Sequence, residues 1–230
     1  MSGLFTGFPK QGVKFLKDLK KHNDREWFKE HKGDFEELLL NPAMAFVEEM
    51  GERLRELSPG VNAIPKVDKS IFRIHRDTRF SKDKSPYKTH IGILFWDGVK
   101  KKMECPGYYF HFDTEKLNCY GGLYEFSKPA LAAYREAVVD DKLGAQLKKI
   151  VGRLEKQKLG IRGQHYKKVP RGMDPEHPNA ELLKHSGLWA AFGEKHPPEM
   201  HSPELVDWCI EPWKKMLPLH DWLKELNERV

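Results

Sequence analysis

The stretch that decides the fold is 89–124, "THIGILFWDGVKKKMECPGYYFHFDTEKLNCYGGLY". It contains three short apolar runs, and the linkers between them are polar and turn-prone. In the middle run, Tyr109, His111 and Asp113 alternate with aromatic residues, which is the period-two pattern of a half-buried strand. Linkers of this kind favour antiparallel pairing of neighbouring strands. The segment therefore predicts strands at 89–96, 107–113 and 117–124.

The residues just before this stretch predict a further strand and a long loop. "SIFRIHR" (70–76) alternates, with Phe72 and Ile74 on one face and Arg73 and His75 on the other. Residues 77–88 then join two strands and are too many for a tight hairpin. We expect a mainly antiparallel sheet of about four or more strands over residues 70–124.

Helices are predicted before and after the sheet region in the sequence, over 10–58 and within 127–228. Asn23-Asp24 supplies a break and a new N-cap, Asn41-Pro42 is expected to end one helix and start another, and Ser127 caps the first helix after the sheet. Residues 160–178 are rich in Gly, Pro and His and predict irregular structure. Helices, then a sheet, then helices, with no repeat or linker, indicate one α+β domain over residues 1–230.

The composition excludes several classes of protein. No apolar run approaches the length of about 20 residues that a membrane-spanning helix needs, and the N-terminus does not resemble a secretory signal, so we expect a cytoplasmic protein with no membrane contact. Three cysteines without a C-x-x-C pair favour neither disulfides nor a structural zinc site. Phosphate-binding and dinucleotide-binding glycine motifs and the serine-nucleophile motif are missing too. No cofactor is predicted.

The positive charge of the chain is concentrated in one window. The net charge is +6, from 40 basic and 34 acidic residues. Residues 69–102 hold ten basic and three acidic residues, so the remainder holds 30 basic and 31 acidic residues. A generic solvated surface would spread its charge more evenly, so the window predicts an anionic partner.

The core of this window, "RIHRDTRFSKDKSPYK" (73–88), is the predicted binding segment. Arginine offers planar, bidentate recognition of phosphate or carboxylate, lysine adds a point charge, and hydroxyl groups donate further hydrogen bonds. The hypothesis is a pocket for a phosphorylated or carboxylated small molecule, with His75 and His111 orienting the ligand and serving as acid–base candidates. The candidate ligand-binding residues are Arg73, Arg76, Arg79, Ser81, Lys82, Lys84, Tyr87, Lys88 and Tyr109.

Other interpretations of the same segment remain open. Asp77 and Asp83 could pair with the nearby cations and pin the loop, with Phe80 and Tyr87 anchoring it in the core. An open basic face could instead bind the phosphate backbone of a nucleic acid, with aromatic side chains stacking on bases, or meet an acidic protein partner. His75, His111 and Asp113 are metal-ligand types, but neither their number nor their spacing matches a known site, so no metal is predicted.

Four segments also resemble a known family. They are "FTGFPKQGVKFLKDLKKHNDREWFKEHKGDFEELLLNP", "FRIHRDTRFSKDKSPYKTHIG", "GYYFHF" and "LYEFSKPALAAYREAV", and together they are similar to the domain of unknown function 2461 family, from Phe5 to about Trp189. The family pattern has two asparagines before Arg-x-Trp-Phe, where this chain has His22 and Asn23. The resemblance implies one cytoplasmic α+β domain with a basic loop of interest, and it implies no mechanism. Trp27 and Phe28 in this motif have the helical spacing of core residues.

Overall fold

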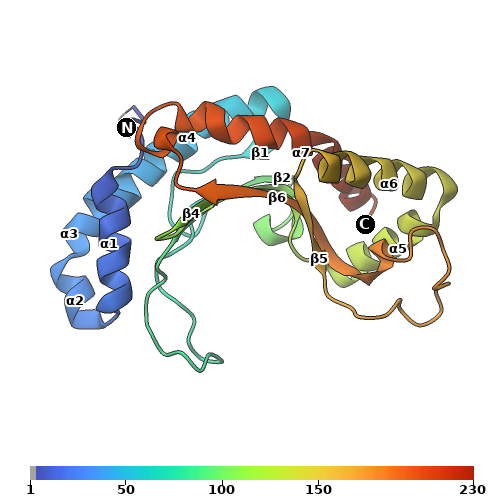
Figure 1. Cartoon of the computed structure of the whole chain (residues 1–230), viewed down its shortest axis with the longest axis horizontal. Coiled ribbons are helices and arrows are strands. Elements are labelled where there is room, and N and C mark those ends of the chain that lie inside the picture. Colours follow the sequence, from blue (N-terminus) through green and yellow to red (C-terminus); the bar gives the residue numbers. More distant parts are fainter. Residues whose placement is uncertain (1–3) are drawn as a thin grey trace. The chain divides into compact units, whose positions relative to one another are not determined.

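A computed structural model describes residues 4–230 and contains a six-stranded antiparallel sheet together with helices (Figure 1). The α+β fold class is confirmed. The strands are β1 (Val61–Asn62), β2 (Ile91–Asp97), β3 (Gly107–Phe112), β4 (Lys116–Leu123), β5 (Gly160–Gln164) and β6 (His185–Lys195). The α-helices are α1 (Lys10–Lys21), α2 (Arg25–Glu30), α3 (Lys32–Phe35), α4 (Asn41–Leu57), α5 (Lys128–Val139), α6 (Asp141–Lys156) and α7 (Leu205–Glu228). None of the helices within this range is both long and apolar enough to cross a membrane.

The three apolar runs of the opening stretch form neighbouring strands. The sheet order is β1-β2-β3-β4-β6-β5, so β2, β3 and β4 are adjacent in chain order. In β3, Tyr108, Phe110 and Phe112 are fully buried while Tyr109 and His111 are half-buried. The period-two pattern therefore predicted both the strand and its buried face.

The prediction of a regular strand at 70–76 was wrong. The segment is extended, but it forms only isolated bridges, from Ile71 to Ile93 and from His75 to Tyr87. It changes partner halfway: Phe72 N–H donates to Gly92 of β2, whereas Arg76 N–H donates to Pro86 of the loop itself. Because its first half pairs with β2 and its second half with the returning loop, no continuous ladder forms.

Two strands lie where helices or irregular structure were expected. β5 begins in the segment predicted to be irregular, and β6 lies inside the predicted C-terminal helical part. They pair antiparallel, with Gly160 opposite Ala191 and Arg162 opposite Trp189. The register shifts between Arg162 and Gln164, where Gly163 adopts a φ of +106°. A short polar strand with a glycine bulge has no apolar period, which is why its sequence predicts a loop.

Asn41-Pro42 does begin an α-helix, as expected, but it does not interrupt the helical path of the chain. A π-helix at Glu36–Leu40 leads directly into α4, and the Asn41 N–H donates to the Glu36 carbonyl five residues earlier. Proline has no N–H to continue an α-helical ladder, and its ring would crowd the carbonyl four residues before it. The wider turn just before Pro42 accommodates the ring and keeps the chain helical. The predicted caps are confirmed, since Asp24 accepts from Trp27 N at 2.9 Å and Ser127 accepts from Ala130 N at 3.4 Å.

The chain divides into two compact units. The first comprises Met1–Phe95, Tyr109–Cys119 and Gly193–Glu211. Its core is a cluster of aromatic rings, in which Phe46 and Phe110 lie 4.6 Å apart and Phe8 and Phe112 lie 4.8 Å apart. The single-domain organisation stays a prediction.

The second unit comprises Trp96–Tyr108, Tyr120–Phe192 and Pro212–Val230. Within it, Trp213 Nε1 donates to the Tyr120 carbonyl at 3.0 Å. The ring of Tyr134 stacks on Phe126 at 4.6 Å, and its hydroxyl donates to the Leu182 carbonyl at 2.9 Å. Each buried polar group of these aromatic residues therefore has an acceptor, as a stable core requires.

Candidate functional site

The basic loop, residues 76–88 of the first unit, holds its own arginines in ion pairs. Arg76 pairs with Asp83, and its guanidinium also donates to the Ser85 carbonyl at 3.1 Å and to Ser81 Oγ at 3.4 Å. Hydrogen bonds from Ser85 and from Arg76 lower the pKa of Asp83 to about 2. The Asp83 carboxylate is ionised at neutral pH, and it neutralises Arg76, one of the residues predicted to bind an anion.

Arg79 is held in a similar way. Its Nε and Nη2 donate to the Asp77 carboxylate at 3.0 and 2.7 Å, and its backbone N–H donates to the same group at 3.1 Å. These bonds lower the pKa of Asp77 to about 2. Arg76 and Arg79 thus both have carboxylate partners inside the loop, which is the arrangement that the pinning alternative describes.

The lysines of the loop are less constrained. Lys84 Nζ donates to the Thr78 carbonyl at 2.9 Å, and Lys82 is exposed. Lys88 Nζ donates to the Arg73 carbonyl at 2.9 Å and lies 5.6 Å from the centre of the Phe72 ring. The side chain of Arg73 is exposed. The Lys88 ammonium thus lies against the extended segment that precedes the loop.

The end of the loop is anchored by a residue to which the sequence assigned only a helix break. The Asn23 side chain donates to the Tyr87 carbonyl and accepts from the Tyr87 N–H, both at 3.0 Å. Tyr87 is buried, and its ring stacks on Phe28 at 4.1 Å. His75, an exposed acid–base candidate, lies 5.1 Å from the Tyr87 ring. Tyr87 therefore anchors the loop, and His75 lies beside this anchor.

A second group of polar residues lies on β3 and beside β2. We call it the histidine face, and it consists of Lys88, His90, Tyr109, His111 and Asp113. The rings of His90 and His111 lie 4.5 Å apart, and Tyr109 Oη is 3.4 Å from His111 Nδ1. His111 Nε2 is 4.0 Å from the Asp113 carboxylate. The imidazole of His111 is therefore flanked by a hydroxyl on one side and a carboxylate on the other.

Two further residues shape the histidine face. Gly92 leaves room for the Tyr109 ring, because a Cβ there would lie 2.3 Å from Tyr109 Oη. Phe72 meets the edge of Tyr109 at 5.8 Å and also lies beneath the Lys88 ammonium. The structure thus brings together Tyr109, His111 and Lys88 of the predicted site.

Burial and neighbouring charges shift the pKa values of both histidines. Desolvation lowers the pKa of His90 to about 4, with further contributions from the charges of His111 and Lys88. Desolvation also lowers the pKa of His111, although the Asp113 carboxylate opposes this shift. Both imidazoles are consequently neutral at pH 7, when each offers one N–H donor and one acceptor nitrogen. His90 was missed as a candidate because it stands at the first residues of a predicted strand, where nothing in the pattern marks function.

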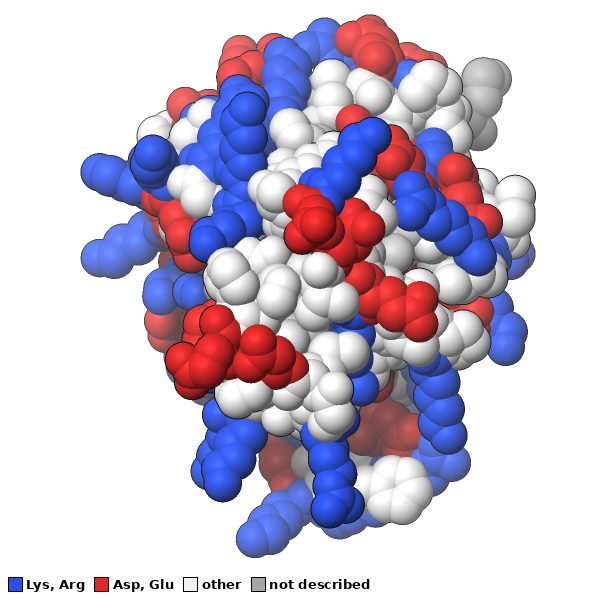
Figure 2. Space-filling model, turned by 90° about the vertical axis from the view of Figure 1, so that its right-hand side faces the viewer, with Lys and Arg blue, Asp and Glu red and all other residues white. Residues whose placement is uncertain are grey.

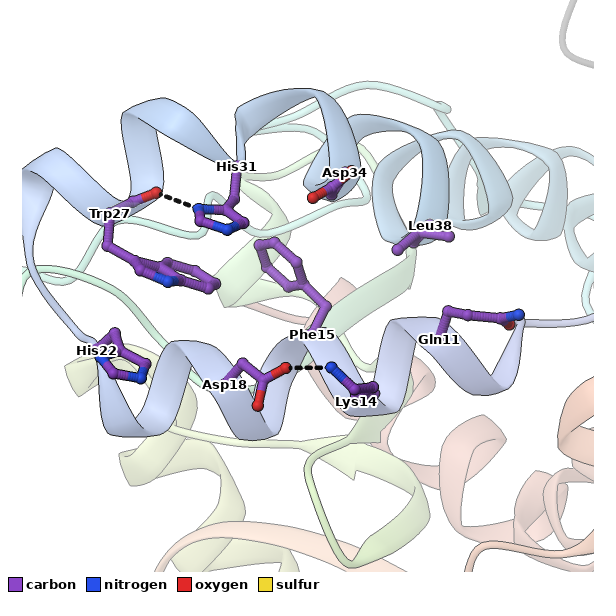
Figure 3. Close-up of a pocket in the computed structure, with 9 residues that line it drawn as sticks. All are labelled: Gln11, Lys14, Phe15, Asp18, His22, Trp27, His31, Asp34 and Leu38. Atoms are coloured by element: carbon purple, nitrogen blue, oxygen red, sulfur yellow. Dashed lines mark hydrogen bonds and ion pairs between the residues drawn. The ribbon is translucent and has the colours of Figure 1, made fainter.

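A hollow of about 480 Å³ lies between α1 and the helical segment that follows it (Figure 3). The indole of Trp27 lies between the imidazoles of His22 and His31, at ring distances of 6.1 and 4.1 Å. His31 Nδ1 donates to the Trp27 carbonyl at 2.8 Å, and Lys14 pairs with Asp18 at 2.8 Å along the α1 side. Trp27 thus lines a surface hollow, in contrast to the core position that its spacing predicts. The polar residues that line the hollow carry both signs of charge, so they favour no single class of ligand.

A buried ionic network lies in the second unit. Asp97 is almost completely buried and contacts His220 Nε2 at 3.2 Å and Lys224 Nζ at 3.0 Å. The ring of Tyr108 stacks on His220 at 4.5 Å. Because these groups are buried and mutually paired, the network is best understood as part of the core. Within residues 4–230, no three His, Cys, Asp or Glu side chains are grouped as a metal ion would require.

On the face drawn in Figure 2, Lys and Arg side chains are interleaved with Asp and Glu side chains. The fold and the site together define an α+β protein with a self-paired basic loop and a half-buried histidine–tyrosine cluster beside its sheet.

Comparison with known families identifies the chain more closely. A family model described as conserved hypothetical protein (DUF2461) matches residues 11–222, and the chain belongs to this family. The resemblance seen in the sequence is thereby confirmed. A comparison with curated proteins gave no match. The description of the family names no activity, so the function has to be argued from the geometry of the site.

Proposed function

We propose that the histidine face binds a small anion that carries a phosphoryl or carboxyl group. The observation that carries this proposal is the contact between two neutral imidazoles, His90 and His111, beside the ammonium group of Lys88. Lys88 supplies the charge, while the imidazole N–H groups and the Tyr109 hydroxyl supply directional donors. Half-buried donors are worth more to an anion than donors on an open surface.

The lowered pKa values support the same assignment. Burial and the nearby positive charge of Lys88 disfavour a proton on His90, and an anion bound here would remove part of that penalty. Binding should therefore raise the pKa of at least one imidazole and draw a proton from solution near neutral pH. Proton uptake of this kind distinguishes an anion at the histidine face from an anion on an exposed lysine.

The proposal differs from the sequence hypothesis in the cations that hold the ligand. Arg76 and Arg79 are ion-paired with Asp83 and Asp77, so we assign binding of the ligand to Lys88 and the imidazoles. His111 keeps its acid–base assignment, because the Tyr109 hydroxyl and the Asp113 carboxylate flank its two ring nitrogens. A group so placed can move a proton to or from a bound ligand.

Isothermal titration calorimetry with inorganic phosphate and short dicarboxylates tests the proposal. We expect binding at pH 6.5 with an apparent enthalpy that depends on the ionisation enthalpy of the buffer, which measures proton uptake. His111→Gln should lower the affinity about tenfold, the loss expected when one charge-assisted hydrogen bond disappears, and should reduce the uptake. His75→Gln is the matched control, because His75 packs against Tyr87, and it should bind like the wild type.

Two results would contradict the proposal. One is binding of equal strength in the wild type and in His111→Gln. The other is binding whose enthalpy is the same in all buffers, since an anion beside the two imidazoles should raise their pKa values and cause proton uptake.

A further inference from the structure

The tip of the basic loop, residues 79–84, presents an aromatic ring to solvent. Phe80 is 94% exposed, whereas Tyr87, the other aromatic residue of the loop, is 6% exposed and anchored. The sequence predicts that both rings anchor the loop, and only Tyr87 does so. Exposure of a large apolar side chain at a projecting tip leaves its hydrophobic free energy unused in folding, so the ring is available to a partner.

The tip is held in place by hydrogen bonds on both sides of Phe80. Asp77 binds the backbone and side chain of Arg79, and Asp83 accepts from the Ser85 N–H at 2.9 Å and from the Ser85 hydroxyl at 2.6 Å. Lys84 closes the loop by donating to the Thr78 carbonyl. The ring is therefore presented by an ordered loop, and less conformational entropy is lost when a partner binds.

One cationic side chain lies against this ring, and two more follow it in the same loop tip. The guanidinium carbon of Arg79 lies 5.7 Å from the centre of the Phe80 ring, and Lys82 and Lys84 are exposed on the same short tip. We propose that the loop tip binds single-stranded nucleic acid, with one base stacked on Phe80 and with the exposed Lys82 and Lys84 in contact with phosphates. Stacking of one base on one aromatic ring, combined with a few phosphate contacts, is the usual chemistry of such surfaces.

The composition of the tip favours nucleic acid over the other anionic partners. A membrane surface needs more than one apolar side chain to hold a protein, and Phe80 is the one large apolar residue within 79–84. An acidic peptide would use the cations and would leave the aromatic ring exposed. A single ring among cations matches an alternation of base and phosphate, in which each nucleotide offers one flat face and one negative charge.

Fluorescence anisotropy with a labelled oligothymidylate of about ten nucleotides, close to common site sizes, provides the test. With two to three phosphates contacted, the logarithm of the binding constant should fall with the logarithm of salt concentration at a slope of about −1.5 to −2. Phe80→Ala should weaken binding about tenfold and leave this slope unchanged, because the ring contributes stacking and no charge. Lys82→Gln should reduce the slope by about 0.7, the contribution of one phosphate contact to a single strand.

Matched controls distinguish binding at the loop tip from nonspecific binding through exposed apolar side chains and from binding at the histidine face. Val99→Ala removes another fully exposed apolar side chain and should leave the affinity unchanged, as should His111→Gln. Phe80→Trp keeps an aromatic platform and should bind at least as well as the wild type. Because Phe80 and Lys82 are exposed, their variants should fold normally, and circular dichroism checks this.

Three outcomes would overturn the proposal: no binding of the oligonucleotide at low salt, equal affinity of Phe80→Ala and the wild type, or Phe80-dependent binding to vesicles of phosphatidylserine without binding to the oligonucleotide. The last would identify an anionic lipid surface as the partner.

Discussion

Acidification should destabilise this protein through His90, and the size of the effect follows from its surroundings. Desolvation, together with the charges of His111 and Lys88, lowers the pKa of His90 to about 4 in the folded protein. In the unfolded chain the pKa returns to about 6.5. Between these two values the unfolded chain binds more protons than the folded protein. Stability is therefore complete above about pH 6.5, declines as the pH falls toward 4, and is constant below that.

The expected loss can be worked out for a change from pH 7 to pH 5. One unit of pKa difference corresponds to about 1.4 kcal/mol, and over this interval the full shift would cost about 1.8 kcal/mol. The ring of His90 is only half-buried, and salt screens the part of the shift that comes from neighbouring charges. We therefore expect His90 to contribute about 1 kcal/mol of lost stability.

Urea denaturation of the wild type and of His90→Gln at both pH values measures this contribution. Other titrating groups affect both proteins, so they cancel when the pH-dependent loss of one is subtracted from that of the other. The wild type should lose about 1 kcal/mol more than the variant, and an NMR titration should give a midpoint near pH 4 for the His90 ring. Equal losses in the two proteins would refute the argument that His90 is buried as a neutral group.

Three further perturbations test the packing. Asp97→Asn should lower the free energy of unfolding by about 2 kcal/mol, because it removes the buried carboxylate that pairs with Lys224 and contacts His220, and a loss below about 1 kcal/mol in urea denaturation would show that the network is dispensable. Gly144→Ala in α6 places a Cβ 2.2 Å from a backbone carbonyl and should cost about 2 kcal/mol, whereas Gly152→Ala in the same helix meets nothing within 4 Å and should stabilise by about 0.5–1 kcal/mol. Thermal unfolding of the pair checks the opposite signs. Asn23→Ala removes both hydrogen bonds to the Tyr87 backbone and should cost about 1–2 kcal/mol. It should also speed proteolysis within 77–88, and an unchanged cleavage rate would mean that the anchor lies elsewhere.

The parts of the fold that the sequence predicted are those governed by local alternation. β3 and β4 each keep one buried face over several residues, while β2 is an apolar run buried over nearly its whole length, and both patterns are visible without knowledge of any partner. The segment 70–76 has the same alternation, but its pairing is divided between β2 and the loop. Alternation predicts extended backbone there, and it carries no information about which neighbour accepts each hydrogen bond.

The sequence predicted where basic residues concentrate, but not the contacts that they make. The excess of charge around Arg76 and Arg79 is a property of composition, but their pairing with Asp83 and Asp77 depends on the path of the loop. The meeting of His90 with His111 depends on the register between two strands. One residue of slip would have turned a side chain to the opposite face of the sheet, so no one-dimensional pattern could identify that pair.

The π-helical turn at Glu36–Leu40 affects which neighbours the helical rod formed by residues 32–57 can contact at each end. Each residue of an α-helix advances the side-chain direction by about 100°, so a turn with one surplus residue resets the phase between the stretches on either side of it. Upstream, α3 places Asp34 at the hollow beside α1, and downstream α4 buries Phe46 and Met50 in the core. Deleting a single residue from this turn would leave the rod helical while swinging one of these surfaces away from its neighbour.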